Sequence, residues 1–69
     1  MKKQEAYITL GQFLKLKDYV NSGGEAKYLI NTFSIQVNGE DDNRRGRKLY
    51  NDDVVVINGT SYTVNGINV

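Results

Sequence analysis

Cysteine and histidine are both absent from the 69-residue sequence. A disulfide framework is therefore excluded, and so are the ligands that structural zinc sites usually use. A chain of this length buries only about 60% of the surface that its unfolded form exposes, so its core must be small and held by packing and hydrogen bonds. We expect one domain over residues 1–69, and the lack of cysteine fits a cytoplasmic location.

Long apolar runs are missing as well. The first ten residues, MKKQEAYITL, contain two lysines followed by Gln4 and Glu5. They include no apolar stretch as long as a signal peptide or a membrane span needs. We therefore expect a soluble intracellular protein with no membrane partner.

Groups for catalysis and for metal binding are scarce. Without histidine or cysteine, no serine or threonine has a familiar activating base, and no glycine-rich stretch has Walker or dinucleotide-binding spacing. Glu40, Asp41 and Asp42, like the later pair Asp52 and Asp53, lack EF-hand spacing, so we interpret them as turn residues exposed to water. Asp53 precedes a predicted strand and can accept hydrogen bonds from nearby backbone amides. We expect a non-enzyme with no cofactor, no metal and no small-molecule substrate.

The first helix signal begins at Thr9. Thr9 and Gln12 have the Ser/Thr-x-x-Glu/Gln spacing of a capping box, which predicts a helix from Leu10 to about Val20. Its apolar residues lie mostly on one side of the helix: Leu10, Phe13, Leu14, Leu16 and Val20. Lys15 and Asp18 are then left for water, with Lys17 near the boundary.

A second, shorter helix follows a glycine pair. Ser22 and Glu25 repeat the capping-box spacing, and apolar residues recur at helical intervals up to Phe33. Gly23 and Gly24 at the junction allow the two helices to approach closely, so we expect an angled pair instead of one rod.

Strand patterns occupy the start and the second half of the chain. Two Asn-Gly pairs, at residues 38–39 and 58–59, predict tight hairpin turns. The predicted strands are residues 6–8, 34–37, 54–57 and 61–64, whereas the final GINV is too short to assign. The sequence therefore predicts an α+β fold in which two helices pack on a small, mainly antiparallel sheet with a C-terminal hairpin.

Positive charge is concentrated in residues 43–49, NRRGRKL, which we call the basic segment. The whole chain has nine basic and eight acidic residues, so this segment is a local patch on a nearly neutral molecule. Arginine grips phosphate with two hydrogen bonds and stacks on bases, and Gly46 lets the backbone approach closely, so the segment suits RNA.

Other residues can join the basic segment in one site. Lys15 and Lys17 on the first helix, and Lys27 on the second, are expected to flank one groove with it. The free amides at the start of the second helix can receive a phosphate oxygen. Three tyrosines are candidates for stacking on bases, with partly buried packing as the alternative: Tyr28, Tyr50 and Tyr62.

Three segments in this order resemble a known family: TLGQFLKLKDYVNSGGEAKYLI, IQVNGE and NRRGRKLYNDDVVV. They are similar to the S4-type RNA-binding domain, named the alpha-L motif after its two-helix L shape, and in particular to small stand-alone bacterial members. The resemblance covers about Thr9 to Ile57 and rests on the combination of segments.

The resemblance implies a non-catalytic protein that presents a positive surface to structured RNA, commonly ribosomal, on the ribosome or an assembly intermediate. It implies RNA contacts for Ser22, Gly24, Lys27, Asn38, Arg44, Arg45, Arg47 and Lys48. Two positions depart from the family pattern. Gly23 stands where many members have arginine, and Asp52 stands where most have glycine, although aspartate tolerates the left-handed turn conformation.

Two other interpretations of the basic segment stay open. It can act in a protein-interaction module that binds an acidic partner. Alternatively, its arginines serve stability alone by pairing with the neighbouring carboxylates of Asp41, Asp42, Asp52 and Asp53.

Overall fold

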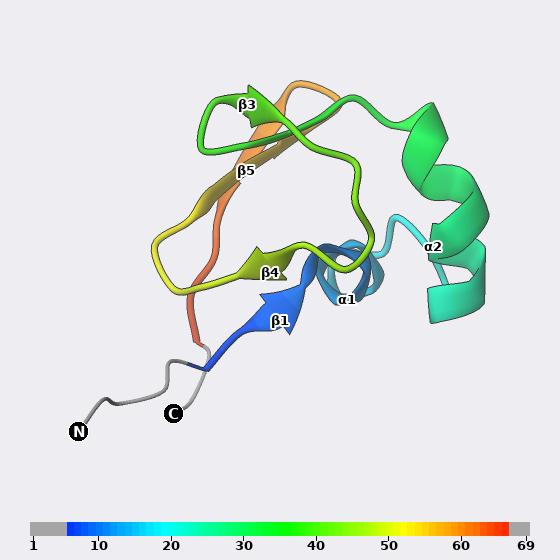
Figure 1. The fold of residues 1–69 in the computed structure, drawn as a ribbon, viewed down its shortest axis with the longest axis horizontal. Coiled ribbons are helices and arrows are strands. Elements are labelled where there is room, and N and C mark those ends of the chain that lie inside the picture. Colours follow the sequence, from blue (N-terminus) through cyan, green and yellow to red (C-terminus); the bar gives the residue numbers. More distant parts are fainter. Residues whose placement is uncertain (1–5, 67–69) are drawn as a thin grey trace.

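Two short helices lie beside two antiparallel sheets in the computed structural model, which describes residues 6–66 (Figure 1). The helical elements are α1 (Leu10–Leu16), α2 (Gly23–Leu29) and a 3₁₀ turn, η1 (Ile30–Thr32). The strands are β1 (Ile8–Thr9), β2 (Ile35–Val37), β3 (Glu40–Asp41), β4 (Lys48–Leu49), β5 (Val54–Ile57) and β6 (Thr60–Thr63). The predicted α+β fold with a C-terminal hairpin is confirmed, although the strands form two sheets instead of one.

The larger sheet has the order β3-β2-β5-β6, and its hairpins follow from the Asn-Gly turns. Asn38 and Gly39 have φ of 52° and 87°, and Asn58 and Gly59 have φ of 50° and 88°. Two successive positive φ values are the signature of a type I′ turn, whose twist matches that of the flanking strands. Both hairpin predictions are confirmed.

The core lies between α1 and the inner face of the larger sheet. Alternation places Ile35 and Val37 of β2 and Val55 and Ile57 of β5 on one face, where each is at most 4% exposed. They form one apolar cluster with buried residues of the helices and of the smaller sheet: Leu10, Phe13, Leu14, Val20, Ala26, Ile30, Leu49 and Val64.

The smaller sheet consists of β1 and β4 alone, with Ile8 opposite Leu49 and Thr9 opposite Lys48. The expected first strand at residues 6–8 is therefore shifted to Ile8–Thr9. Lys48 lies on a strand and not in a loop, and Leu49 beside it is fully buried. The C-terminal end of the basic segment is thus anchored in the core.

Helix α1 ends at Leu16, four residues earlier than expected, because Asp18 takes the left-handed conformation with φ of 65°. The Asp18 amide donates to the Lys15 carbonyl at 3.1 Å, and the Tyr19 amide donates to the Leu14 carbonyl at 2.9 Å. This pair of bonds is a Schellman C-cap. Leu16 is 67% exposed, so its expected place on the apolar side was wrong.

An α-helix turns by about 100° per residue, and this rotation explains why Leu16 faces water whereas Lys17 lies on the apolar side. Leu10, Phe13 and Leu14 define the buried face, and Leu16 lies about 120° from its centre at that rotation, whereas Lys17 lies on the buried side. The Lys17 ammonium accordingly lies 5.6 Å from the Phe13 ring centroid and 5.3 Å from that of Tyr62.

The Asp18 cap gives a stability prediction. We expect Asp18→Gly to raise the free energy of unfolding by up to about 1 kcal/mol, because glycine adopts a positive φ without a Cβ penalty. Urea unfolding of the variant beside Asp18→Ala measures this effect. Alanine keeps the penalty and loses the polar side chain, so a glycine variant less stable than the alanine variant would contradict the account.

The two helix caps differ in detail. The Thr9 amide donates to Gln12 Oε1 at 2.8 Å and the Gln12 amide donates to Thr9 Oγ1 at 3.2 Å, so the first capping box is complete. At α2, Ser22 Oγ accepts from the Glu25 amide, but Glu25 Oε1 accepts from the Asn21 amide at 2.6 Å. The second box is therefore only half formed.

Neither helix within residues 6–66 has the length and apolar character for crossing a membrane.

Candidate nucleic-acid interface

The basic segment is held against the start of α1 by backbone hydrogen bonds. The amides of Leu10 and Gly11, which have no partner inside the helix, donate to the carbonyls of Arg47 and Arg45 at 2.8 and 2.9 Å. A tight turn in which the Arg47 amide donates to the Arg44 carbonyl at 3.0 Å sets the path of the segment. Figure 1 shows this stretch of chain passing over α1. The segment is therefore a fixed part of the fold.

Gly11 is the point of closest approach between α1 and the basic segment. A Cβ atom at this position would lie 2.6 Å from Arg45 Cγ and 3.4 Å from the Arg45 carbonyl oxygen. Only glycine lets Arg45 lie directly over the helix at this distance.

A hollow of about 320 Å³ opens at the helix junction, and we call it the junction hollow. It is lined by Thr9, Gly11, Gln12, Lys15, Gly23, Arg45 and Gly46. Arg45 Nη1 donates to the Gly23 carbonyl at 3.5 Å, a long bond, and the rest of the guanidinium has no hydrogen-bond partner among residues 6–66. The structure thus brings one lysine, one arginine and the glycine junction together.

The other two helix lysines do not line the junction hollow. Lys17 lies against Phe13 and Tyr62, and Lys27 is exposed on α2. The expectation that three lysines flank one groove is met only by Lys15. RNA contacts of Lys17 and Lys27 stay predictions.

The start of α2 is less suited to phosphate than expected. Ser22 Oγ already accepts from the Glu25 amide at 3.2 Å. The Glu25 carboxylate lies at the same helix end, where it accepts from Asn21, and repels a second anion. Cationic side chains, more than backbone amides, make this surface positive. RNA contacts of Ser22 and the exposed Gly24 stay predictions.

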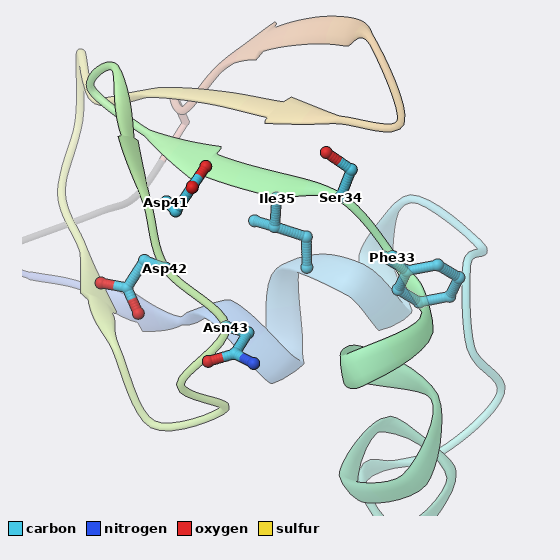
Figure 2. Close-up of a pocket in the computed structure, with 6 residues that line it drawn as sticks. All are labelled: Phe33, Ser34, Ile35, Asp41, Asp42 and Asn43. Atoms are coloured by element: carbon cyan, nitrogen blue, oxygen red, sulfur yellow. The ribbon is translucent and has the colours of Figure 1, made fainter.

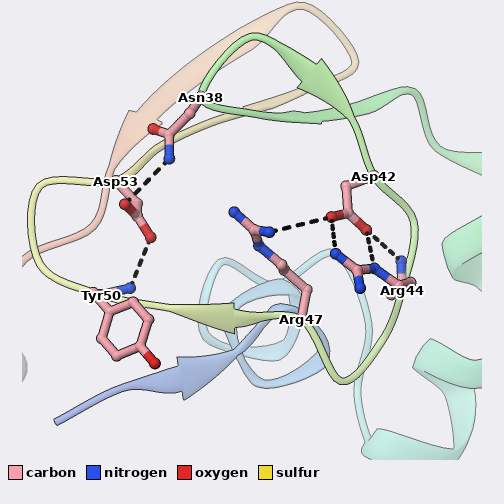
Figure 3. Close-up of polar contacts among 6 residues, drawn as sticks. All are labelled: Asn38, Asp42, Arg44, Arg47, Tyr50 and Asp53. Carbon is pink, nitrogen blue, oxygen red and sulfur yellow. Dashed lines mark hydrogen bonds and ion pairs between the residues drawn. The ribbon is translucent and has the colours of Figure 1, made fainter. Parts of the chain in front are cut away.

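A second hollow of about 600 Å³ lies on another side of Gly46, and we call it the strand hollow. Its lining residues are Arg44, Gly46, Arg47, Lys48, Tyr50 and Asp53. Figure 3 shows the Arg47 guanidinium pointing into the space between Asp53 and Asp42. Arg47 Nε is buried and has no hydrogen-bond partner within the described part of the chain.

Asp42 binds two arginines of the basic segment. Arg44 donates to it from the backbone amide at 3.0 Å, from Nε at 3.1 Å and from Nη2 at 2.8 Å (Figure 3). Arg47 Nη1 lies 3.7 Å from Asp42 Oδ2. The side chain of Asp42 is only 10% exposed, so its interpretation as a water-exposed turn residue was wrong. The carboxylate fixes the Arg44 fork, which leaves Arg44 less free than Arg45.

Asp42 also borders a third hollow of about 350 Å³ between β3 and the start of β2. Figure 2 shows Asp41, Asp42 and Asn43 on one side of it and Phe33, Ser34 and Ile35 on the other. The Asn43 side-chain amide donates to Asn31 Oδ1 at 2.8 Å, which ties the beginning of the basic segment to η1.

The Asp42–Arg44 ion pair makes the stability of the fold depend on pH. Hydrogen bonds from Arg44 lower the pKa of Asp42 from 3.8 to about 2. The pair therefore stabilises the fold fully above about pH 4 and loses its effect as pH falls through 2. We expect Asp42→Asn to lower the free energy of unfolding at pH 7 by about 1 kcal/mol, and this deficit to shrink as pH falls through 2, where half of the Asp42 carboxyl is still ionised in the folded state. Urea unfolding from pH 2 to 7 measures this, and an equal deficit at both extremes would contradict it.

Asn38 and Asp53 brace the turn after β4. The Asn38 side-chain amide donates to Asp53 Oδ1 at 3.2 Å, and the Val54 amide donates to Asn38 Oδ1 at 2.9 Å. Asp53 Oδ2 accepts from the Tyr50 amide at 2.9 Å, as expected for this position (Figure 3). Asp52 has φ of 78°, which confirms the left-handed conformation. The Asn38 side chain is thus engaged inside the fold, and its RNA contact stays a prediction.

Comparison with known proteins identifies a family and a relative. The family described as S4 domain matches residues 1–65. A protein of Bacillus subtilis (strain 168) named "Probable ribosome maturation protein RlbA" is 62% identical over 52 residues, which are 75% of this chain and 73% of that protein. No solved structure matches the chain significantly.

Proposed function

Because this chain belongs to the S4 domain family, we propose that it is a non-catalytic RNA-binding protein whose basic face contacts structured ribosomal RNA. The relative's name, a ribosome maturation protein, supports a role on the ribosome or on an assembly intermediate. The resemblance seen in the sequence agrees with the family match.

The junction hollow carries the proposal. Lys15 and Arg45 border the same concave surface, and the glycine junction removes side chains that would fill it. A phosphate in the hollow is reached by an ammonium and by a guanidinium whose internal partner is distant at 3.5 Å. Recognition of this kind reads the shape and backbone of folded RNA, with little dependence on base identity.

The three arginines of the basic segment differ in how available they are for RNA contacts. Arg45 is the most available arginine, because Arg44 makes three bonds to Asp42 and Arg47 is half-buried. The stability interpretation therefore applies to Arg44 and, in part, to Arg47. Within residues 6–66 their ion pairs are both with Asp42, and none involves Asp41, Asp52 or Asp53.

Competition for a labelled ribosomal RNA fragment tests the proposal. We expect unlabelled folded RNA to displace it at least about tenfold better than duplex DNA of matched length, because the RNA and DNA double helices differ in groove shape and only RNA has the 2′-hydroxyl. Equal competition by DNA would mean general affinity for polyanions and would contradict RNA recognition.

Nuclease treatment separates the protein-partner alternative. Both an RNA and an acidic protein would dissociate at high salt, so salt alone does not distinguish them. We expect ribosomal material that co-purifies with the protein to be released by ribonuclease. Material that stays bound after complete digestion would favour an acidic protein partner instead.

A further inference from the structure

The smaller sheet displays an aromatic pair on the face opposite the core. Leu49 points inward and is fully buried, so its neighbours Lys48 and Tyr50 point to the other side. Tyr7, next to Ile8 of β1, lies against Tyr50 with ring centroids 5.9 Å apart and an interplanar angle of 61°. The Lys48 ammonium lies 4.9 Å from the Tyr7 ring centroid.

This pair differs from the other tyrosine pair of the fold. Tyr19 and Tyr62 share a hydroxyl hydrogen bond of 2.8 Å and pack on the core. Their rings are also in edge contact with Phe33 and Phe13, respectively. Tyr7, by contrast, is 46% exposed. The Tyr19–Tyr62 pair is structural, whereas the Tyr7–Tyr50 pair offers ring surface to a ligand.

Cationic residues lie beside the Tyr7–Tyr50 pair in the strand hollow. Tyr50 lines the strand hollow together with Arg44, Arg47 and Lys48. Thr9, which is paired with Lys48, lines the junction hollow. Tyr7 precedes Thr9 by two residues, and β1 leads directly into α1. The aromatic pair therefore lies next to the surface proposed for structured RNA.

We propose that the Tyr7–Tyr50 pair is a stacking site for one unpaired nucleotide of the bound RNA, with Lys48 and Arg47 as the cations for its phosphate. The inference rests on the proposed function and adds that the RNA has a single-stranded residue beside its folded part. The base takes the place of the Lys48 ammonium on the Tyr7 ring, and the flexible lysine stem carries that charge to the phosphate. Stacking on a ring is tolerant of base identity, so the site recognises an unpaired base of any sequence.

A pair of RNA probes with identical phosphates tests the stacking site. The first is an RNA hairpin with a three-adenosine tail at each end, and the second has abasic residues in the tails. We expect wild type to bind the adenosine-tailed probe about 5- to 100-fold more tightly, the range of stacking one base on an aromatic ring. Tyr7→Leu keeps apolar bulk but removes the ring, so it should bind both probes equally and match wild type on the abasic probe.

Tyr28→Leu tests the other exposed tyrosine that the sequence suggested for stacking, because Tyr28 is 74% exposed and lies on α2 instead of beside the smaller sheet's strands. It should keep the preference for adenosine tails. Tyr50→Leu serves as the second ring variant if Tyr7→Leu does not fold.

The outcomes separate the two proposals. Equal binding of the two probes by wild type would overturn the stacking site and leave the proposed function standing. A preference that survives in both ring variants, or that Tyr28→Leu abolishes, would also overturn the site. Failure of wild type to bind either probe or ribosomal RNA would overturn both.

Discussion

Replacing Lys15 and Arg45 together by alanine is expected to weaken binding of structured ribosomal RNA by about 150-fold or more near 0.1 M salt. These side chains border the junction hollow, and hydrogen bonds to charged groups are worth about 1.5–3 kcal/mol each when a partner is present. The slope of log affinity against log salt concentration should also become shallower, by roughly the amount expected for the loss of two phosphate contacts. Fluorescence anisotropy with a labelled RNA fragment measures both effects.

A matched variant separates geometry from total charge. Lys17→Ala with Lys27→Ala also removes two positive charges, one from the C-cap of α1 and one from α2, but neither residue lines the junction hollow. We expect this variant to lose less than about threefold in affinity, because neither ammonium lies in the junction hollow and only long-range charge is removed. A loss that small would also argue against the RNA contacts predicted from the sequence for Lys17 and Lys27. An equal loss in the two double variants would show that net charge, and not the junction hollow, determines binding.

The second large effect concerns two glycines at equivalent helix positions. Gly11 and Gly24 are each the second residue of their helix, but only Gly11 lies under another part of the chain. A Cβ on Gly11 would meet Arg45 Cγ at 2.6 Å, whereas a Cβ on Gly24 would have Ser22 Oγ at 3.9 Å as its nearest neighbour. Gly11→Ala should therefore lower the free energy of unfolding by about 1–3 kcal/mol through overpacking.

Gly24→Ala should act in the opposite direction and stabilise the fold by about 0.5–1 kcal/mol, because alanine loses less backbone freedom in a helix. Parallel urea titrations of the two variants compare the signs. Gly11→Ala should also weaken RNA binding, since the clash displaces Arg45 from the junction hollow. Stabilisation by both alanines would refute the close packing of Arg45 on α1.

Local signals in the sequence were sufficient for most of the fold. The Thr9–Gln12 capping box and the two Asn-Gly turns involve residues close in sequence, so their side-chain chemistry determines the geometry directly. The end of α1 was placed too late because Asp18 adopts a left-handed conformation that glycine more often takes, so no glycine marks the position. The Schellman bonds that end the helix join backbone atoms, and the apolar residue Val20 continues the helical spacing beyond them.

The candidate site was predicted less completely, because its arrangement depends on contacts between distant segments. The basic segment was found from charge alone, but its support by the amides of α1 was not visible in the sequence. Asp42 looked like one of several exposed carboxylates until the turn placed it against Arg44 and Arg47. Tyr7 was missed, since only the pairing of β1 with β4 brings it to Tyr50.

Lys17 illustrates how helix geometry could have corrected the prediction earlier. At about 100° per residue, position 17 returns to the side of residues 10, 13 and 14, so its stem was bound to lie along apolar surface. The structure places its ammonium near the rings of Phe13 and Tyr62. Lys15 lies on another side of the helix and lines the junction hollow instead.

The affinity of the wild-type protein for a folded ribosomal RNA fragment, measured from about 0.05 to 0.5 M salt, tests the central claim most directly. Neutralisation of roughly four or five phosphates predicts that log affinity falls against log salt concentration with a slope of about −3 to −4. A slope near zero would contradict recognition of the RNA backbone by the basic face.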